Sequence, residues 1–313
     1  MIRANLDADT LAKVRLAMSP AAEATAWLTL TAGRGRHPVF GDPGAAARAA
    51  LADEDARLVA SVLPPPGTRA YTPDLLTPKP GKDLDDQLDR IAATPEDMVA
   101  DQLASTGRPL PPQVRAAVDD GTFAPRAARG LRRFWRSAIG DGWTALKATM
   151  DADLADRART MATQGVGALL GSLHEAVTWA DGTLSIQSAW QEEFTLHGVE
   201  IVCVPAVLAW PKLAIQLCDP DDAVLGYPAA GVGRRAGAPH AVDRLVGTTR
   251  AALLRDLDVP RSTATLAARH HLAPPTVSYH LKVLQRTGLV VTHRDGLFVL
   301  YQRTDAGHAL ARG

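Results

Sequence analysis

The chain has only two cysteines in 313 residues, Cys203 and Cys218. Two cysteines cannot build the disulfide framework of a small secreted protein, so both are expected to be reduced, buried thiols. The longest uncharged apolar run, 201–210, is broken by Pro205 and is shorter than the ~20 residues of a membrane span. The first residues lack a signal-peptide core. We therefore expect a soluble cytoplasmic protein with no membrane partner.

The chain also has no net charge, because 34 basic residues balance 34 acidic residues. As a whole it is neither a basic tail nor a polyanion-binding protein. Lysine is scarce: 28 of the basic residues are arginine and 6 are lysine, which indicates a high-GC bacterial genome rather than a function. The length suggests about two domains of ~150 residues. Apolar residues make up 46%, enough for a core that needs no disulfide or metal.

Signatures of catalysis are missing as well. The sequence contains no nucleophile elbow, phosphate-binding loop, zinc-protease motif or pair of cysteines at metal-binding spacing. The glycine pairs at 165–167 and 231–233 are isolated, and they fit helix packing and a linker. His174, Glu175 and His197 have no evident catalytic partner. We expect no enzymatic activity, no cofactor and no metal site.

Residues 1–228 predict an α+β domain that is mostly helical and ends in a small sheet. Helical periodicity covers residues 8–30, 43–60, 111–119 and 124–138. Thr94 and Pro95 predict a helix start, with threonine as the N-cap and proline in the first turn. A stripe of apolar residues three and four apart predicts a long amphipathic helix from residue 143. Short strands are expected at 177–179, 184–186, 193–197, 201–205, 213–217 and 223–227.

The remaining residues divide into a linker at 229–242 and a second domain at 243–313. The second domain carries ten basic and five acidic residues, so its net charge is +5 while the rest of the chain carries −5. A basic end on a neutral protein is typical of nucleic-acid contact, because phosphates attract that end alone.

The pattern within 243–313 predicts a winged helix-turn-helix. A helix at 245–257 ends before Pro260, and a short helix that Thr263 caps follows. The third helix begins at Pro274 and stops at Gly288, and two strands are joined by a turn at Asp295-Gly296. This order of three helices and a hairpin is that of a C-terminal winged helix.

The third helix has two different faces. At 100° per residue, Val277, Leu281 and Leu284 fall on one side, and Tyr279, Lys282 and Arg286 fall opposite them. These polar side chains can contact base edges and phosphates in a major groove. The same pattern is also compatible with an ordinary solvated helix face.

The segment from Ala251 to Tyr301, with Thr-Val-Ser-x-His-Leu-Lys-x-Leu at 276–284 as its core, closely resembles the ArsR/SmtB family of bacterial winged-helix regulators. The resemblance covers about 70 residues of the chain. It implies a homodimeric transcriptional regulator, usually a repressor that an inducer releases from a near-palindromic operator. It also implies DNA contacts by the recognition helix and the wing tip. The contacts expected from both arguments are Thr276, Ser278, Tyr279, His280, Lys282, Arg286 and Arg294.

The sequence departs from that family in three places. The helix at 265–271 has no cysteine, and Asp305 and His308 alone do not define a metal site. Ala273 replaces the usual serine or threonine before the recognition helix, at a cost of about 1 kcal/mol for the lost cap. The last helix is short for the usual dimer contact, so the N-terminal domain is expected to supply one.

All six tryptophans lie outside the winged helix. Aromatic walls are typical of small-molecule pockets, although tryptophan also packs well in any core. Trp179, Trp190 and Trp210 border the predicted sheet, and we expect them to line a pocket for a small apolar or aromatic ligand. The sequence therefore predicts a homodimeric DNA-binding repressor with a ligand-sensing N-terminal domain. The alternative is an N-terminal domain that binds a protein or dimerises without any ligand.

Overall fold

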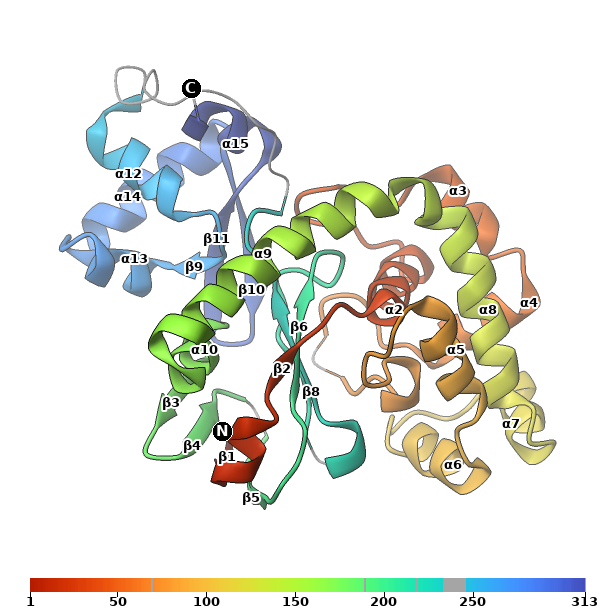
Figure 1. Ribbon diagram of the computed structural model, residues 1–313. Coiled ribbons are helices and arrows are strands. Elements are labelled where there is room, and N and C mark those ends of the chain that lie inside the picture. Colours follow the sequence, from red (N-terminus) through yellow and green to blue (C-terminus); the bar gives the residue numbers. More distant parts are fainter. Residues whose placement is uncertain (69, 189, 218, 233–245, 313) are drawn as a thin grey trace.

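A computed structural model describes residues 1–68, 70–188, 190–217, 219–232 and 246–312 (Figure 1). The fold is α+β and mostly helical, as predicted. Buried apolar side chains form separate clusters in a helical unit, a sheet unit and a C-terminal winged helix. Figure 1 shows the sheet unit between the other two. No helix in the described part of the chain is long and apolar enough to span a membrane.

The helical unit surrounds one central helix. Its elements are α2 (Pro20–Ala32), α3 (Gly44–Ala50), α4 (Glu54–Val62), η1 (Asp74–Leu76), α5 (Leu84–Ala92), α6 (Glu96–Ala104), α7 (Pro112–Asp119) and α8 (Phe123–Ala138). α8 buries Phe123, Leu131 and Phe134 against its neighbours. A Cβ at Gly130 would lie 2.4 Å from the carbonyl carbon of Asp55, so glycine allows α8 to cross α4 at close range.

The sheet unit combines the first residues of the chain with residues far along it. Its strands are β1 (Ile2–Leu6), β2 (Arg15–Leu16), β3 (Val177–Ala180), β4 (Thr183–Ile186), β5 (Glu192–Leu196), β6 (Val202–Ala206), β7 (Ala214–Gln216) and β8 (Val224–Pro228). They form two sheets, in the orders β3-β4-β1-β5 and β2-β6-β8-β7. β1 pairs antiparallel with β4 and parallel with β5. α1 (Ala8–Ala12) and η3 (Pro220–Asp222) complete the connections.

A long helix joins these two units. α9 (Trp143–Gln164) follows η2 (Gly140–Gly142) and crosses from the helical unit to α10 (Val166–Ser172) beside the sheets (Figure 1). The predicted apolar stripe is only partly buried, since Met150 is fully buried while Trp143 and Leu146 are half-buried. Gly165 ends the helix with a φ of +89°, which glycine adopts without strain.

Two buried ionisable side chains fasten the helical unit to the loop after β6. Glu23 of α2 accepts hydrogen bonds from the backbone N–H groups of Val207 and Leu208, at 2.7 and 2.6 Å. His37 contacts the carbonyl oxygen of Val207 at 3.0 Å through Nε2. Burial raises the pKa of Glu23 to about 7, although the two N–H groups oppose this, and burial lowers the pKa of His37 to about 4.

The C-terminal unit has the predicted helix and strand order. It consists of α12 (Thr248–Asp256), β9 (Arg261–Ser262), α13 (Thr263–Arg269), α14 (Pro274–Arg286), β10 (Val290–Asp295), β11 (Phe298–Arg303) and α15 (Asp305–Arg312). The three strands form a sheet in the order β10-β11-β9. This is a winged helix-turn-helix with one added helix at its end.

Three local predictions were wrong by one or two residues. Ser262, not Thr263, caps α13, because its hydroxyl accepts the N–H of Thr265. Asp295 pairs with Phe298, so the hairpin turn is Gly296-Leu297 rather than Asp295-Gly296. Gly296 has a φ of +59°, which suits the first position of a two-residue turn.

The predicted start of α6 also differs. The helix begins at Glu96, Pro95 is its N-cap and no side chain caps it, so Thr94 lies outside the helix. Of the predicted linker, Ala229 and Val232 are fully buried, and residues 233–242 lie outside the described residues. Cys203 is buried in β6, where desolvation raises the pKa of its thiol to about 12. Cys218 also lies outside the described residues.

Candidate nucleic-acid interface

α14 is fixed in the winged helix by its apolar side. Pro274 lies in the first turn and Ala273 makes no side-chain cap, as the sequence indicated. The side chains of Val277, Leu281 and Leu284 are at most 1% exposed. Gly288 follows the helix with a φ of +72° and directs the chain into β10. Burial of this one side leaves the opposite side of α14 free for contact.

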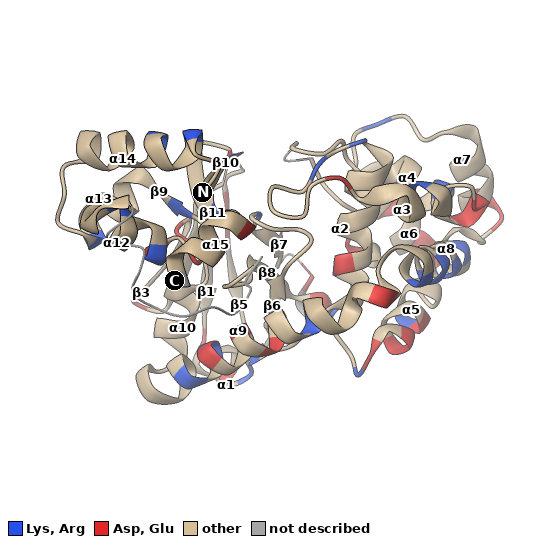
Figure 2. Ribbon diagram, turned by 90° about the horizontal axis from the view of Figure 1, so that it is seen from above, with Lys and Arg blue, Asp and Glu red and all other residues tan. Residues whose placement is uncertain are grey.

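The opposite side of α14 is open. Tyr279 is 65% exposed, and Thr276, Lys282 and Arg286 are also exposed. Figure 2 shows α14 at an outer edge of the molecule, with basic residues along it. Lys282 and Arg286 form no ion pair with any residue that the structure describes. Both cations are therefore available to an outside anion.

Two predicted contact residues of α14 are less accessible than the others. Ser278 and His280 are half-buried. The His280 ring packs edge-on against Tyr279, with 5.5 Å between ring centres. Its Nδ1 is buried without a hydrogen-bond partner among the described residues. His280 can therefore reach a ligand only through the outer part of its ring.

Two arginines and a histidine beside α14 share one carboxylate of the protein. Asp256 at the end of α12 accepts two hydrogen bonds from Arg269, at 2.7 and 3.1 Å. It also lies 3.3 Å from Arg261 Nε and 3.1 Å from His270 Nε2. Burial raises the pKa of Asp256, but the Arg269 hydrogen bond and the neighbouring charges outweigh burial and lower it below its ordinary value. Asp256 balances only one of the two arginine charges, so this surface stays positive and Lys282 and Arg286 add to its charge.

The hairpin β10–β11 is the wing. Gln285 of α14 donates a hydrogen bond from Nε2 to the hydroxyl of Thr292 in β10, at 3.1 Å. Arg294 is exposed near the tip, and its hydrogen bond to Gly296 O is local and long, at 3.4 Å. The Gln285–Thr292 hydrogen bond therefore joins α14 to the wing, and an exposed guanidinium lies beside the turn.

A carboxylate from the sheet unit contacts the helix-turn-helix. Glu175, between α10 and β3, accepts hydrogen bonds at Oε2 from Ser262 N at 2.8 Å and from Thr265 Oγ1 at 3.0 Å. This residue occupies the N-terminal end of α13, where four backbone N–H groups need acceptors. The sequence contained no signal for this contact, because 87 residues separate Glu175 from Ser262.

The chain that leaves β8 is held from both sides. Asp153 of α9 accepts hydrogen bonds from Tyr227 Oη at 2.7 Å and from Ala230 N at 2.8 Å. On the winged-helix side, Gly231 N donates to Asp258 O at 3.1 Å. His308 Nε2 lies 2.8 Å from Val232 O. Residues 227–232 therefore connect α9 with the winged helix through hydrogen bonds on both sides.

The three tryptophans chosen as pocket residues do not lie together. Trp179 is half-buried on β3 against α10, and Trp190 is 51% exposed after β4. Trp210 is 3% exposed in a separate cluster with Met150 and Val207. Its indole N–H is buried without a hydrogen-bond partner among the described residues. The three side chains therefore form no common wall for a ligand.

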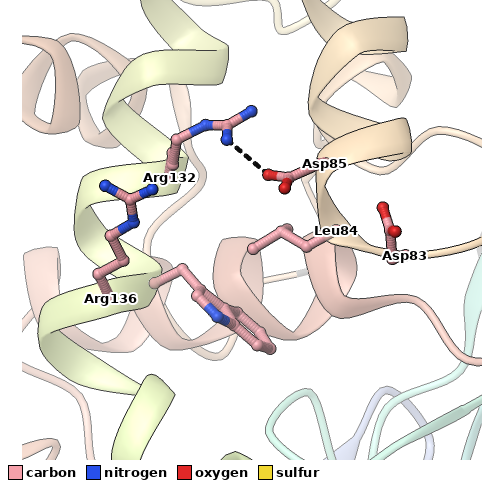
Figure 3. A pocket seen from close by; sticks show the side chains of 6 residues that line it. Asp83, Leu84, Asp85, Arg132 and Arg136 are labelled. Carbon is pink, nitrogen blue, oxygen red and sulfur yellow. Dashed lines mark ion pairs between the residues drawn. The ribbon is translucent and has the colours of Figure 1, made fainter.

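A surface depression of about 310 Å³ lies between α5 and α8 (Figure 3). It is lined by Asp83, Leu84, Asp85, Arg132, Trp135 and Arg136. An ion pair between Arg132 and Asp85 crosses it, so its charged lining differs from an apolar pocket. No group of three or more metal-binding side chains occurs among the described residues.

Comparison with known proteins agrees with the order of elements in the C-terminal unit. Residues 248–293 match a family model described as a helix-turn-helix domain. This range extends from the start of α12 into β10 and includes all of α14. No curated protein and no solved structure matches the chain. The match indicates a DNA-binding regulator, a class that is typically not enzymatic.

Proposed function

We propose, from the helix-turn-helix match and the open face of α14, that this protein is a sequence-specific regulator of transcription that binds double-stranded DNA. The single observation that carries the proposal is the placement of Tyr279, Lys282 and Arg286 on the exposed side of a helix whose other side is buried. A major groove admits one α-helix, and these side chains suit its base edges and phosphates. Thr276, Ser278 and His280 flank this face, and Arg294 extends it at the wing.

The charge distribution supports DNA rather than a neutral partner. Residues 243–313 carry a net charge of +5 on a neutral chain. Asp256 balances one of the two arginine charges beside α14, and Lys282, Arg286 and Arg294 add exposed positive charge to that surface. Each phosphate contact of this kind releases counterions and makes binding dependent on salt. Binding in the cytoplasm, at the nucleoid, follows from this assignment.

The protein acts in this proposal as a homodimeric, ArsR-like repressor. Two copies of α14 would enter successive major grooves, so the operator is near-palindromic with half-sites about 34 Å apart. The residues before the linker supply the dimer contact, because α15 has only eight residues.

Regulation in this proposal comes from the N-terminal units. A small apolar or aromatic ligand that moves α9 would act on the winged helix through Asp153 and the chain after β8. Glu175 provides a second connection, to α13. A coupling of about 1–3 kcal/mol between ligand and DNA is sufficient for control.

The proposal is tested by selecting duplexes from a random DNA library with the full-length protein and then footprinting the protein on the selected duplexes. We expect two protected half-sites separated by about 10 base pairs. Selection of no sequence at all would overturn the assignment. Stoichiometric capture of a protein with no ligand response would instead favour an N-terminal interaction module.

A further inference from the structure

The tip of the wing carries an apolar side chain that is almost completely exposed. Leu297 is 93% exposed, the most exposed of the large apolar side chains that the structure describes. It occupies the second position of the Gly296-Leu297 turn, where hairpins ordinarily place a polar residue. Since Leu297 buries almost no area, it contributes little to folding stability. A contact between Leu297 and another molecule would explain why an apolar residue occupies this exposed turn.

Strand pairing places two exposed side chains on the same face of the wing. Arg294 pairs with Val299, and residues paired across an antiparallel hairpin point to the same side. Val299 is 43% exposed and Arg294 is exposed. Thr292 points to that side as well, by the two-residue period of a strand, and it accepts the hydrogen bond from Gln285 of α14. This face of the wing therefore adjoins α14 at Gln285, on the flank of the exposed side of the helix.

The length of the wing suits the spacing of DNA grooves. From Thr292 to the turn at Gly296 is four residues, or about 14 Å of strand. Half of a 34 Å helical turn, about 17 Å, separates a major groove from the next minor groove. The strand is therefore about 3 Å shorter than the distance between the grooves, and a leucine side chain at the turn spans most of that difference.

We propose that Leu297 is a wedge that enters the minor groove next to the half-site read by α14 and partly unstacks one base step. Arg294 and Val299 line the same groove in this arrangement. Apolar wedges of this kind kink DNA, and arginine is attracted to the strong negative potential of narrow A·T-rich minor grooves. The flexible TA step costs least to open, so operators carry it at this position. This inference rests on the proposed function and adds DNA bending to it.

The test compares Leu297→Ser with wild type on a duplex selected by the full-length protein, with end-to-end energy transfer reporting the bend. Serine is compatible with the turn, so the variant is expected to keep its fold. We expect affinity to fall about tenfold or more, and the bend and the TA preference to be lost. Met98→Ser, at an exposed methionine of α6, is the matched control and leaves all three unchanged.

A second measurement does not depend on any variant. 2-Aminopurine placed in the TA step should brighten when wild type binds, because unstacking relieves its quenching. If Leu297→Ser binds and bends the duplex as wild type does, Leu297 is not a wedge. The proposed function would still hold in that case, provided that Lys282→Ala weakens DNA binding. A changed oligomeric state with unchanged DNA binding would also overturn the wedge, in favour of a protein contact. Failure of wild type to select any duplex would overturn both proposals.

Discussion

Glu175 accepts a hydrogen bond from the backbone N–H of Ser262 at 2.8 Å, and this contact joins the sheet unit to the helix-turn-helix. The same oxygen accepts the hydroxyl of Thr265 at 3.0 Å. One carboxylate from the sheet unit thus adds to the Ser262 cap at the N-terminal end of α13. The position of α13, and of α14 behind it, depends on a residue of another unit.

Replacement of Glu175 by alanine is expected to loosen the winged helix. The Ser262 N–H would lose its acceptor, so we predict a fall of about 1–3 kcal/mol in the free energy of unfolding. The Ser262 amide should also lose protection in hydrogen exchange. Glu193→Ala, at an exposed glutamate of β5, is the control and should change neither. Equal protection of Ser262 in Glu175→Ala and wild type would contradict the role given to this contact.

Much of the winged helix could be predicted from the sequence because its signals are local. The Val277, Leu281 and Leu284 stripe, the proline start and the Gly288 stop all act within one helix. The β1 strand could not be predicted in the same way, since its partners in β4 and β5 lie about 180 residues further along the chain. The Glu175 contact was missed for the same reason.

The tryptophan prediction shows where composition is insufficient. Trp179, Trp190 and Trp210 lie near the same strands in the sequence but occupy different surroundings in space. Trp179 packs against Gly167 because the backbone of α10 approaches β3 closely; the glycine pair at 165–167 indicated helix packing, but the sequence did not identify Trp179 as the partner. The hairpin turn lies one residue later than predicted. The strand register determines which residues remain unpaired, and the turn residues alone do not fix that register.

The close approach at Gly167 can be tested directly. A Cβ there would lie 2.3 Å from Trp179 Nε1, so Gly167→Ala should force α10 away from β3. We predict a loss of about 1–3 kcal/mol in the free energy of unfolding by urea, as for other overpacked sites. Gly171 lies in the same helix, has no positive φ, and an added Cβ there would meet no atom closer than 3.7 Å, so Gly171→Ala is the matched control and should cost nothing. Similar losses in the two variants would disprove the packing account.

The Glu23 and His37 pair predicts a particular dependence on pH. Folding raises the pKa of Glu23 from 4.5 to about 7, so this residue makes the free energy of unfolding decrease as pH rises across that range. Folding lowers the pKa of His37 from 6.5 to about 4, so His37 makes it increase as pH rises between those values. From pH 4.5 to 6.5 the two contributions, each of order 3 kcal/mol, largely cancel.

When one of the two residues is replaced, the pH dependence that the other gives to the free energy of unfolding should become measurable. His37→Gln is expected to make the free energy of unfolding fall more steeply with pH from 4.5 to 7 than in wild type. Glu23→Gln should make it rise more steeply from pH 4 to 6.5. Chemical denaturation at half-unit pH intervals, with each variant compared with wild type, measures both slopes. Slopes that do not differ from wild type would show that neither group titrates as assigned.

Side chains on the outer face of α14 should affect DNA binding in different ways. Lys282→Ala removes a phosphate contact, so we predict weaker binding to every duplex and a salt dependence reduced by about one contact. Tyr279→Ala should instead reduce discrimination between selected and scrambled duplexes by about 1–3 kcal/mol. Lys82→Ala, at an exposed lysine before α5, is the charge control. Small and equal effects of Lys282→Ala and Tyr279→Ala would contradict this reading of the surface.

The most direct test of the central claim is the affinity of the full-length protein for its selected duplex and for a scrambled duplex across a salt series. We predict that the selected duplex is bound about 10³-fold more tightly at physiological salt. The affinity should also fall steeply as salt increases. Weak binding that is equal for the two duplexes at every salt concentration would show that α14 does not read DNA sequence.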